Sequence, residues 1–424
     1  MKSAPSSRRF QSLADARGSQ YWRWRAIFST IPDSESKRSG DLQVSGPRIA
    51  SIELGTLVGR RPRLAGYNAR KKDDHGWEAP VSLARVTTAD GAAGFGVSNL
   101  TRQQAESFLE KPLHELITAE NGVDPKAFAL ETPLWDLLGQ RAGLPVYRIL
   151  ADRAGRKVAE PLRVPCYDTT LLIDDLHLPT HAEGAALIAS EARFGYEQGH
   201  RAFKIKVGRG ARHMPLEEGN CRDIAVVRAV RAAVGPDATI LIDANNGYTL
   251  NIAKHILSET AGCNLFWLEE AFHEDDELYE DLHAWIEREG LSVLIADGEG
   301  AASPHLLAYA RRGIVDVIQY DIFSYGLTKW LQTAPKLDAW NVRTAPHHYG
   351  RHLGNFVSGH LAPAAENFAF VEWDELSTPG LDSSAYAVEN GMVSLPDAPG
   401  FGLNLDDDLF RKAVKENGFV VKCT

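Results

Sequence analysis

The sequence has few cysteines, no long apolar run and a deficit of basic residues, and each of these properties argues against a class of protein. Only four cysteines occur among 424 residues, and no two of them form a CxxC pair. A disulfide framework and a thiolate metal site are therefore not expected, and a reducing cytosol is the simplest compartment, so we expect a cytoplasmic protein. No apolar run is long enough to span a membrane. A twin arginine lies near the start, but no apolar segment typical of a signal peptide follows it.

Positive charge is also scarce. The chain carries 46 lysines and arginines against 56 aspartates and glutamates, which gives a net charge of −10 at pH 7. A general nucleic-acid binder usually presents a basic face, so that class is not expected, although a local basic pocket for an anionic substrate is compatible with this balance. A dinucleotide-binding dehydrogenase is disfavoured too. The nearest glycine-rich piece, VGRGARHMPLEEG, lacks the G-x-G-x-x-G pattern.

The first part of the chain predicts a mixed α+β domain. Residues 1–46, rich in serine, arginine and glycine, are interpreted as an N-terminal extension. Residues 47–165 begin with alternating strand patterns, contain a polar, basic loop at 57–80, and have an Asp90-Gly91 hairpin turn. Helical patterns follow, and the first opens with Thr101 and Gln104 at the spacing of a capping box.

The pattern changes at about residue 166, where short apolar strands begin to alternate with helices. Repeated β–α units indicate a parallel sheet. Their number between residues 166 and 375 favours a (β/α)8-type barrel, with a doubly wound sheet as the alternative. The helix around 222–234 is expected to end at Gly235-Pro236.

Ionisable or amide residues stand at the end of each predicted barrel strand. They are Lys204, Lys206, Asp243, Asn245, Glu269, Glu270, Asp297, Glu299, Asp321, His347 and His348. Successive groups are separated by about one β–α unit, and the carboxyl ends of barrel strands form the mouth in which active sites lie. A solvated surface would scatter its charges, so we expect these side chains to converge.

Strand parity divides these residues, because side chains alternate between the two faces of a strand. Phe203, Ile205 and Val207 are expected to face the helices, so Lys204 and Lys206 point into the barrel. The same count places Asp243 and Asn245 on one face, turns Glu269 inward and Glu270 outward, and selects His347 over His348.

Taken singly, these residues have ordinary explanations: an amphipathic strand, a helix N-cap, surface charge or a structural histidine. Such explanations do not account for three acidic residues on consecutive β–α units, Asp243, Glu269 and Glu299. Hard oxygen ligands around one centre are what Mg²⁺ prefers, whereas cysteines and clustered histidines would have indicated zinc. The sequence therefore predicts a magnesium site.

The motifs together resemble the enolase superfamily and its mandelate racemase-like subgroup. The pieces KIK, DAN, WLEEA, ADGE, DIFSYGLT and APHH occur in the family's order, and the resemblance covers about residues 47–420. It implies an α/β fold, a modified (β/α)7β-type TIM barrel with an N-terminal α+β capping domain that residues 376–424 complete. Two departures, Ala271 for the usual proline and Tyr325 for a common glycine, concern the substrate more than the chemistry.

The resemblance also implies roles for particular residues. Asp243, Glu269 and Glu299 would hold one Mg²⁺ per chain. Lys206 and His347 would be acid/base groups, Asp321 would orient His347, and Lys204 would donate to the substrate carboxylate. We expect Lys204 and burial to lower the pKa of Lys206. Candidate substrate-binding residues are Asn245, Arg60, Asn68, His348 and Glu372. A homo-oligomer, from dimer to octamer, is implied by analogy.

The implied reaction begins with removal of the proton α to a carboxylate, which gives an enediolate. We expect dehydration of an acid sugar, an aldonate or aldarate, to a 2-keto-3-deoxy acid, because arginines and Asn68 in the loop 57–80 suit carboxylates and hydroxyls. Racemisation or epimerisation of a 2-hydroxy acid is the alternative. A cycloisomerase is less expected, because DIFSYG lacks the lysine of that subgroup, and a non-catalytic Mg²⁺-binding scaffold would have lost a base or a ligand.

Overall fold

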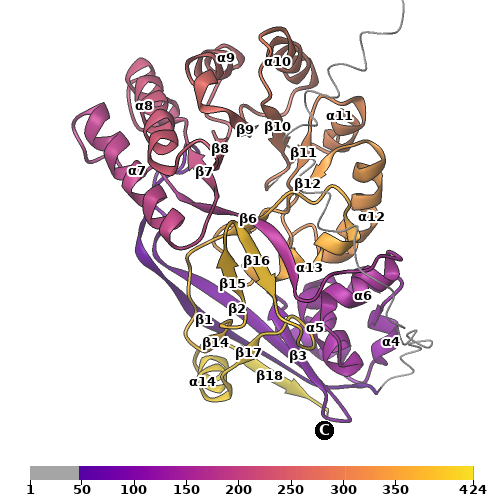
Figure 1. The fold of residues 1–424 in the computed structure, drawn as a ribbon. Helices are drawn as coiled ribbons and strands as arrows, with labels where there is room; N and C mark the ends of the chain where they lie inside the picture. Colours follow the sequence, from indigo (N-terminus) through magenta and orange to yellow (C-terminus); the bar gives the residue numbers. More distant parts are fainter. Residues whose placement is uncertain (1–46, 301, 424) are drawn as a thin grey trace, which may run out of the picture.

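The computed structural model describes residues 47–300 and 302–423, so the predicted extension 1–46 lies outside the described residues (Figure 1). A capping domain is built on an antiparallel sheet of order β18-β1-β2-β3. Its strands are β1 (Ile49–Ala65), β2 (Gly76–Thr88), β3 (Ala93–Val97) and β18 (Phe419–Lys422). Its helices are α3 (Arg102–Phe108), α4 (Leu113–Leu116), α5 (Glu131–Ala142) and α6 (Val146–Arg153), with the short hairpin β4 (Ile117–Thr118) and β5 (Gly122–Val123) between α4 and α5. The capping box at Thr101 and Gln104 is confirmed.

The predicted loop 57–80 is mostly strand, so that expectation was wrong. Strands β1 and β2 pair through Arg60 and Glu78 and again at Ala65 and Gly76, which leaves only residues 66–75 as the loop. The main chain of Arg60 also bonds to Ser377. Charge along residues 60–63 does not prevent a strand here, because this segment extends the β1–β2 hairpin and Arg60 also bridges to Ser377.

The second domain is a closed parallel barrel. Its strands are β6 (Leu162–Leu171), β7 (Ala202–Lys206), β8 (Thr239–Asp243), β9 (Leu265–Glu269), β10 (Leu294–Asp297), β11 (Val317–Ile318), β12 (Arg343–Thr344) and β13 (Val371–Trp373). Strands β6 to β12 pair in chain order, β13 pairs in parallel with β6, and a parallel bridge from Thr344 to Phe368 joins β12 to the segment just before β13. An open, doubly wound sheet would leave two edges, so this closure confirms the (β/α)7β-type barrel.

Helices connect the barrel strands and cover their outer side (Figure 1). They are α7 (His181–Glu197), α8 (Leu216–Val234), α9 (Leu250–Glu259), α10 (Asp276–Arg288), α11 (Leu306–Arg312), α12 (Leu327–Ala339) and α13 (Gly354–His360). As predicted, α8 ends at Gly235, which has a positive φ of 80°. Phe203, Ile205 and Val207 are fully buried in the main core cluster, as strand parity predicts.

The side chains inside the barrel are apolar along part of its axis and ionisable at the carboxyl ends of the strands. A separate core cluster fills it with apolar and aromatic side chains, among them Tyr167, Leu241 and Trp267. The rings of Tyr167 and Trp267 pack edge to face with centroids 5.6 Å apart. The ionisable residues follow at the carboxyl ends of the same strands, so polar groups there stand on a packed apolar floor.

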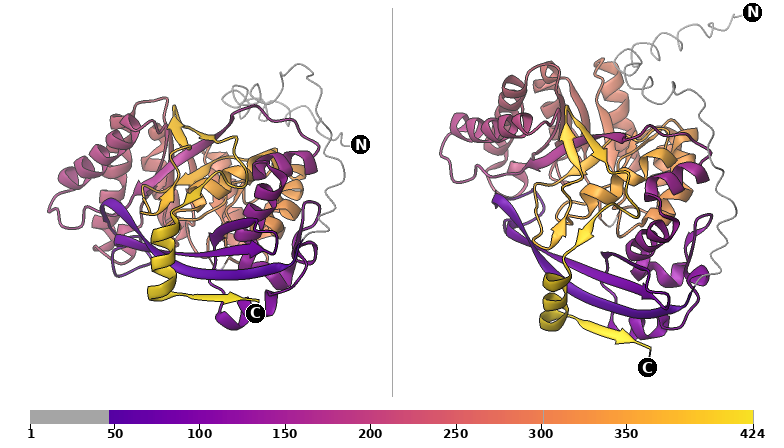
Figure 2. Two further views of the ribbon diagram at one scale, coloured as in Figure 1. Left: turned by 90° about the horizontal axis from the view of Figure 1, so that it is seen from below. Right: turned by 60° about the horizontal axis from the view of Figure 1, so that its bottom comes forward.

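The C-terminal segment returns to the capping domain. It contains β14 (Leu381–Asp382), β15 (Ala387–Glu389), β16 (Met392–Leu395), β17 (Asn404–Leu405) and α14 (Asp407–Asn417) before β18. Strand β18 pairs with β1 from Ser51 to Leu54, and Figure 2 shows the yellow helix and strand beside the indigo β1. Completion of the capping domain by this segment is thus confirmed. No helix in the described part of the chain has the length and apolar character that a membrane crossing needs.

Candidate active site

The two lysines of β7 lie inside the mouth of the barrel. Lys204 is fully buried and Lys206 nearly so. The Nζ atom of Lys204 lies 2.9 Å from Glu269 Oε1 and 3.1 Å from Glu372 Oε1, and Lys206 donates to Asp243. The predicted inward direction of both side chains is confirmed. They carry charge on a buried strand because carboxylates from neighbouring strands surround them.

Asp243, Glu269 and Glu299 form a candidate metal centre. One donor oxygen from each lies within 4.8 Å of the others. Asp243 and Glu269 are fully buried, and the Oε2 atom of Glu299 is buried without a hydrogen-bond partner among the described residues. A buried carboxylate oxygen with no partner is costly unless a ligand satisfies it. An all-oxygen donor set of this kind fits Mg²⁺.

The three carboxyls are not equivalent in their protonation. Burial, together with Asp243, raises the pKa of Glu269 to about 8. Burial also opposes ionisation of Asp243, but Lys206 and Lys204 outweigh it and lower the pKa of Asp243 to about 2. Three carboxyls are thus crowded at one point, where burial favours the protonated form of Glu269 and a bound cation would favour its ionised form.

The expected shift of Lys206 was wrong for this arrangement. Burial and the charge of Lys204 both act to lower the pKa of Lys206, as the sequence predicted. The charge of Asp243 acts in the opposite direction and is stronger, so the net pKa of Lys206 is raised. The reason is the direct pairing of Lys206 with Asp243, whose position beside the lysine the strand pattern did not reveal.

A histidine and an aspartate face the metal centre from β11 and β12. His347 Nδ1 lies 3.2 Å from Asp321 Oδ2, and His347 Nε2 lies 3.4 Å from Glu299 Oε2. Burial opposes the charged imidazole, but Glu299, Glu372 and Asp321 raise the pKa of His347 to about 9. Asp321 is held on its other oxygen by Arg351 at 2.9 Å and by the backbone N–H groups of residues 323 and 324.

Comparison with known proteins agrees with this geometry. A family model described as enolase C-terminal domain-like matches residues 187–409. The chain belongs to the enolase superfamily. A galacturonate dehydratase from Geobacillus sp., solved with D-galacturonate and 5-keto-4-deoxy-D-galacturonate, is similar at 47% identity and a TM-score of 0.84, over 88% of this chain and 98% of that one.

Two further proteins are similar to this enolase-superfamily chain. A mandelate racemase/muconate lactonizing protein from Geobacillus sp. Y412MC10, solved with magnesium and tartrate, is 46% identical with a TM-score of 0.87, over 90% of this chain and all of that one. An arabinonate dehydratase of Saccharolobus solfataricus is 26% identical over 67% of this chain and 70% of its own length.

Two of the predicted substrate-binding residues of this enolase-superfamily chain lie with the cluster. Glu372 is fully buried, accepts a hydrogen bond from Thr169 at 2.7 Å and one from the backbone N–H of His348 at 2.6 Å. Asn245 donates to Glu270 at 3.0 Å, and its own Oδ1 atom is buried without a hydrogen-bond partner in the described chain.

Arg60 and Asn68 are not brought into the cluster, whereas His348 touches it through Glu372. The side chain of Arg60 is 69% exposed and pairs with Glu78. The Oδ1 atom of Asn68 accepts from two backbone N–H groups of its own loop. The ring of His348 is fully buried, with Nε2 2.5 Å from the carbonyl oxygen of Glu372.

Some polar residues at the mouth were missed or misplaced by the sequence analysis. Glu270 was expected to face outward, but it is only 2% exposed and accepts from Asn245 and from Arg70, so that prediction was wrong. Its backbone has a positive φ of 43°, which turns the side chain back over the mouth and ends the strand parity. Gln319, which donates to Glu269 at 2.9 Å, was missed although it stands two residues before Asp321.

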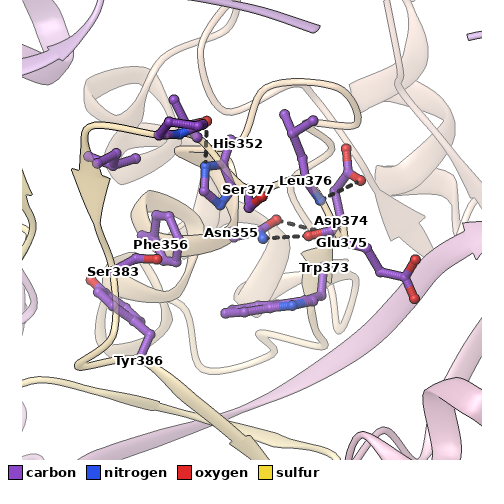
Figure 3. A pocket seen from close by; sticks show the side chains of 13 residues that line it. His352, Asn355, Phe356, Trp373, Asp374, Glu375, Leu376, Ser377, Ser383 and Tyr386 are labelled. Atoms are coloured by element: carbon purple, nitrogen blue, oxygen red, sulfur yellow. Dashed lines mark hydrogen bonds between the residues drawn. The ribbon is translucent and has the colours of Figure 1, made fainter. Parts of the chain in front are cut away.

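A hollow of about 390 Å³ lies beside this site and is not part of it (Figure 3). Trp373, Phe356 and Tyr386 provide aromatic walls, and Asn355 is bonded to the main chain of Asp374 at 2.8 Å. None of the clustered carboxylates or lysines lines it. It lies between α13 and residues 373–386, which also touch directly where His360 lies 2.8 Å from the hydroxyl of Tyr386.

Proposed function

We propose that this chain is a Mg²⁺-dependent dehydratase of an acid sugar, with a hexuronate as substrate. One observation carries the proposal: an acid/base lysine and a histidine–aspartate pair both face one cluster of three carboxylates suited to a cation. Strands β6 and β13 separate β7 from β12 around the barrel, so the two groups approach from different sides. The 47% identical galacturonate dehydratase supports a uronate rather than the aldonate or aldarate that the sequence analysis favoured.

In this proposal Asp243, Glu269 and Glu299 hold the metal ion. When bound, Mg²⁺ supplies positive charge that offsets the charge developing on the substrate carboxylate. Lys204, fixed between Glu269 and Glu372, donates a hydrogen bond to a carboxylate oxygen of the substrate. The apolar floor formed by Tyr167 and Trp267 keeps water away from the reacting carbon on that side.

The proton transfers are assigned to the two remaining groups. Lys206 takes the proton from C5 of the hexuronate, next to the carboxylate, and an enediolate forms on the substrate. That role requires Lys206 to give up the proton which its pairing with Asp243 stabilises. His347, whose charged form Asp321 and its other neighbours favour, gives a proton to the hydroxyl on C4, which leaves as water. The resulting enol becomes a 5-keto-4-deoxy acid.

The test is proton NMR in D₂O with Mg²⁺ and matched sets of hexuronates, aldonates and aldarates. We expect new methylene signals from D-galacturonate or a stereoisomer of it, and none after the metal is removed with a chelator. Loss of the α-proton signal without a methylene product would contradict dehydration and support the second candidate, racemisation or epimerisation, which the same two groups permit.

Two further parts of the proposal concern the setting of the enzyme. A homo-oligomer is proposed by family analogy, and light scattering of the purified chain tests it. A cytoplasmic location is supported by the four cysteines, all of which are free. Fractionation of cells that express the tagged protein tests this location.

A further inference from the structure

The carboxylate of Glu269, one of the proposed metal ligands, is held in place by two neutral donors. Trp267 Nε1 and Gln319 Nε2 both donate to Glu269 Oε2, at 3.2 and 2.9 Å. Lys204 donates to the other oxygen, Oε1, at 2.9 Å. A carboxylate has about four lone-pair positions. The protein uses three of them, so Glu269 can accept in only one further direction.

The amide of Gln319 reaches Glu269 across an intervening strand. Gln319 directly follows β11, Glu269 ends β9, and β10 lies between these two strands. Strand β10 turns Ala296 into the barrel interior and is followed by Gly298, so these small residues leave room for the side chain of Gln319. The backbone N–H of Gln319 donates to the carbonyl oxygen of Asp297 at 2.9 Å. A Cβ added at Gly298 would lie 3.0 Å from the same nitrogen, so the backbone from which the amide extends is closely packed.

Packing alone does not explain an amide at position 319. The side chain of Gln319 is fully buried, and its Oε1 atom has no hydrogen-bond partner in the described chain. A buried carbonyl oxygen without a partner lowers stability, so an apolar side chain of the same length would suit the fold at least as well. The part of the amide that has a partner is Nε2, which donates to Glu269. The effect of Gln319 is therefore exerted on the carboxylate of Glu269.

The other two proposed ligands are held differently. Asp243 pairs with the ammonium of Lys206, and Glu299 Oε2 has no hydrogen-bond partner among the described residues. The two neutral donors orient Glu269 without adding positive charge beside a cation. Mg²⁺ requires nearly octahedral geometry at short distances, whereas Ca²⁺ accepts one or both oxygens of a carboxylate over a wider range. A carboxylate whose direction is fixed therefore suits the smaller ion.

We propose that Gln319 is a positioning residue for the metal ion and for the choice of Mg²⁺ over Ca²⁺. Together with Trp267 it holds Glu269 Oε2, so that the carboxylate offers a single direction to the cation. Gln319 acts through Glu269 and has no part in the proton transfers. This inference rests on the proposed function only for the assignment of the metal ligands.

Calorimetric titration of the metal-free protein with Mg²⁺ and with Ca²⁺, without substrate, tests it. Gln319→Met keeps the length of the side chain and removes its N–H donors. We expect Mg²⁺ to bind about 10- to 100-fold more weakly. Ca²⁺ should bind less than about threefold more weakly, because it tolerates a turned carboxylate. The melting temperature without metal should change little, since the unpaired Oε1 atom is removed together with the donor. Gln140→Met, at an exposed glutamine bonded to the carbonyl oxygen of Pro399 at 3.1 Å, is the matched control.

Trp267→Phe removes the other donor and keeps a ring in the apolar floor, so it should give the same pattern and carries the test if Gln319→Met does not fold. Unchanged Mg²⁺ affinity, or an equal loss for Mg²⁺ and Ca²⁺, would overturn the inference, because a general loss of structure weakens both ions alike. Wild-type protein that binds no Mg²⁺ would overturn it too. The expected pattern in a protein that dehydrates no acid sugar would support the inference and contradict the proposed function.

Discussion

Two buried clusters of charge lie in the same barrel, and they are built on opposite plans. Behind β7, Arg209 and Arg222 pair with Asp175 and Asp223, two cations with two anions, at 2.7 to 2.9 Å. None of these four side chains has a buried polar atom without a partner in the described chain. In the mouth, carboxylates outnumber the lysines, and one oxygen of Glu299 has no hydrogen-bond partner there.

The difference teaches how to tell a structural cluster from a site. In a network whose charges balance and whose polar atoms are all hydrogen-bonded, no group is free to bind a ligand. Such a network therefore has a structural role and fixes the position of the backbone around it. Arg209 donates to the carbonyl oxygen of Lys206 at 3.2 Å, so this network holds the end of β7, which carries the proposed acid/base lysine. An excess of buried acid is unfavourable by itself and becomes favourable when a cation binds, which is what a metal centre needs.

The largest effect is expected from Asp243→Asn. Loss of one proposed metal ligand should lower kcat/KM at least about 10³-fold and abolish Mg²⁺ binding in calorimetry, because several kcal/mol of charge stabilisation depend on the ion. Stability should fall by about 3–5 kcal/mol in the free energy of unfolding, because the variant leaves the buried ammonium of Lys206 without its carboxylate partner. Asp281→Asn, at the surface pair with Lys254, is the control. A variant that binds Mg²⁺ normally would refute the ligand assignment.

Arg209→Met should have the next largest effect, and on stability. Asp223 loses its arginine partner and Asp175 keeps only Arg222, which should cost about 3–5 kcal/mol in the free energy of unfolding measured with urea. Arg228→Met at the surface should cost less than about 1 kcal/mol. If Arg209→Met lowered the free energy of unfolding by no more than Arg228→Met does, the balanced network would contribute no more than an exposed ion pair. The structural role given to this cluster would then be wrong.

Glu191→Gln tests a third cluster, where acid is in excess without a metal centre. Arg63 pairs with Glu191 and Glu375, and burial, opposed by Arg63, raises the pKa of Glu191 to about 8. The folded state therefore keeps a proton that the unfolded state releases above its pKa of about 4.5, so stability falls as pH rises toward 8. The wild type should lose about 2 kcal/mol more than the variant between pH 6 and 8. Parallel urea curves at both pH values would contradict this shift.

Arg60→Gln should have the smallest effect. The exposed pair with Glu78 is worth at most about 0.5 kcal/mol, and the side chain is outside the mouth, so kcat/KM should change less than about twofold. Steady-state kinetics on D-galacturonate measures it. A tenfold loss would restore the role that the sequence analysis gave this residue.

The barrel and the metal centre could be predicted because their signals are local. Each strand carries its own apolar face, and the acids stand at fixed positions after it, so parity alone directs Lys204, Lys206 and Glu269 inward. His347 was selected over His348 on the same ground, and the structure brings His347 to Asp321. Period-2 alternation needs no knowledge of the rest of the chain.

The residues that were missed depend on contacts between distant parts of the chain. Residues 60–65 become a strand by extending the β1–β2 hairpin, and Arg60 also bridges to Ser377, which is far away in the sequence. The side chain of Glu270 turns inward because its backbone adopts a left-handed conformation. The residues of WLEEA give no signal that predicts this conformation. Arg70 reaches Glu270 across 200 positions of sequence, and a run of arginines gives no means of choosing the one that does so.

The pairing of β18 with β1 has a consequence for biosynthesis. The edge of β1 that pairs with β18 is translated about 350 residues before its partner, residues 419–422. At roughly 5–20 residues per second, the ribosome needs on the order of 20–70 s between the two. During that time the nascent chain presents an unpaired strand edge, so a chaperone that shields β1 would act before the barrel is finished.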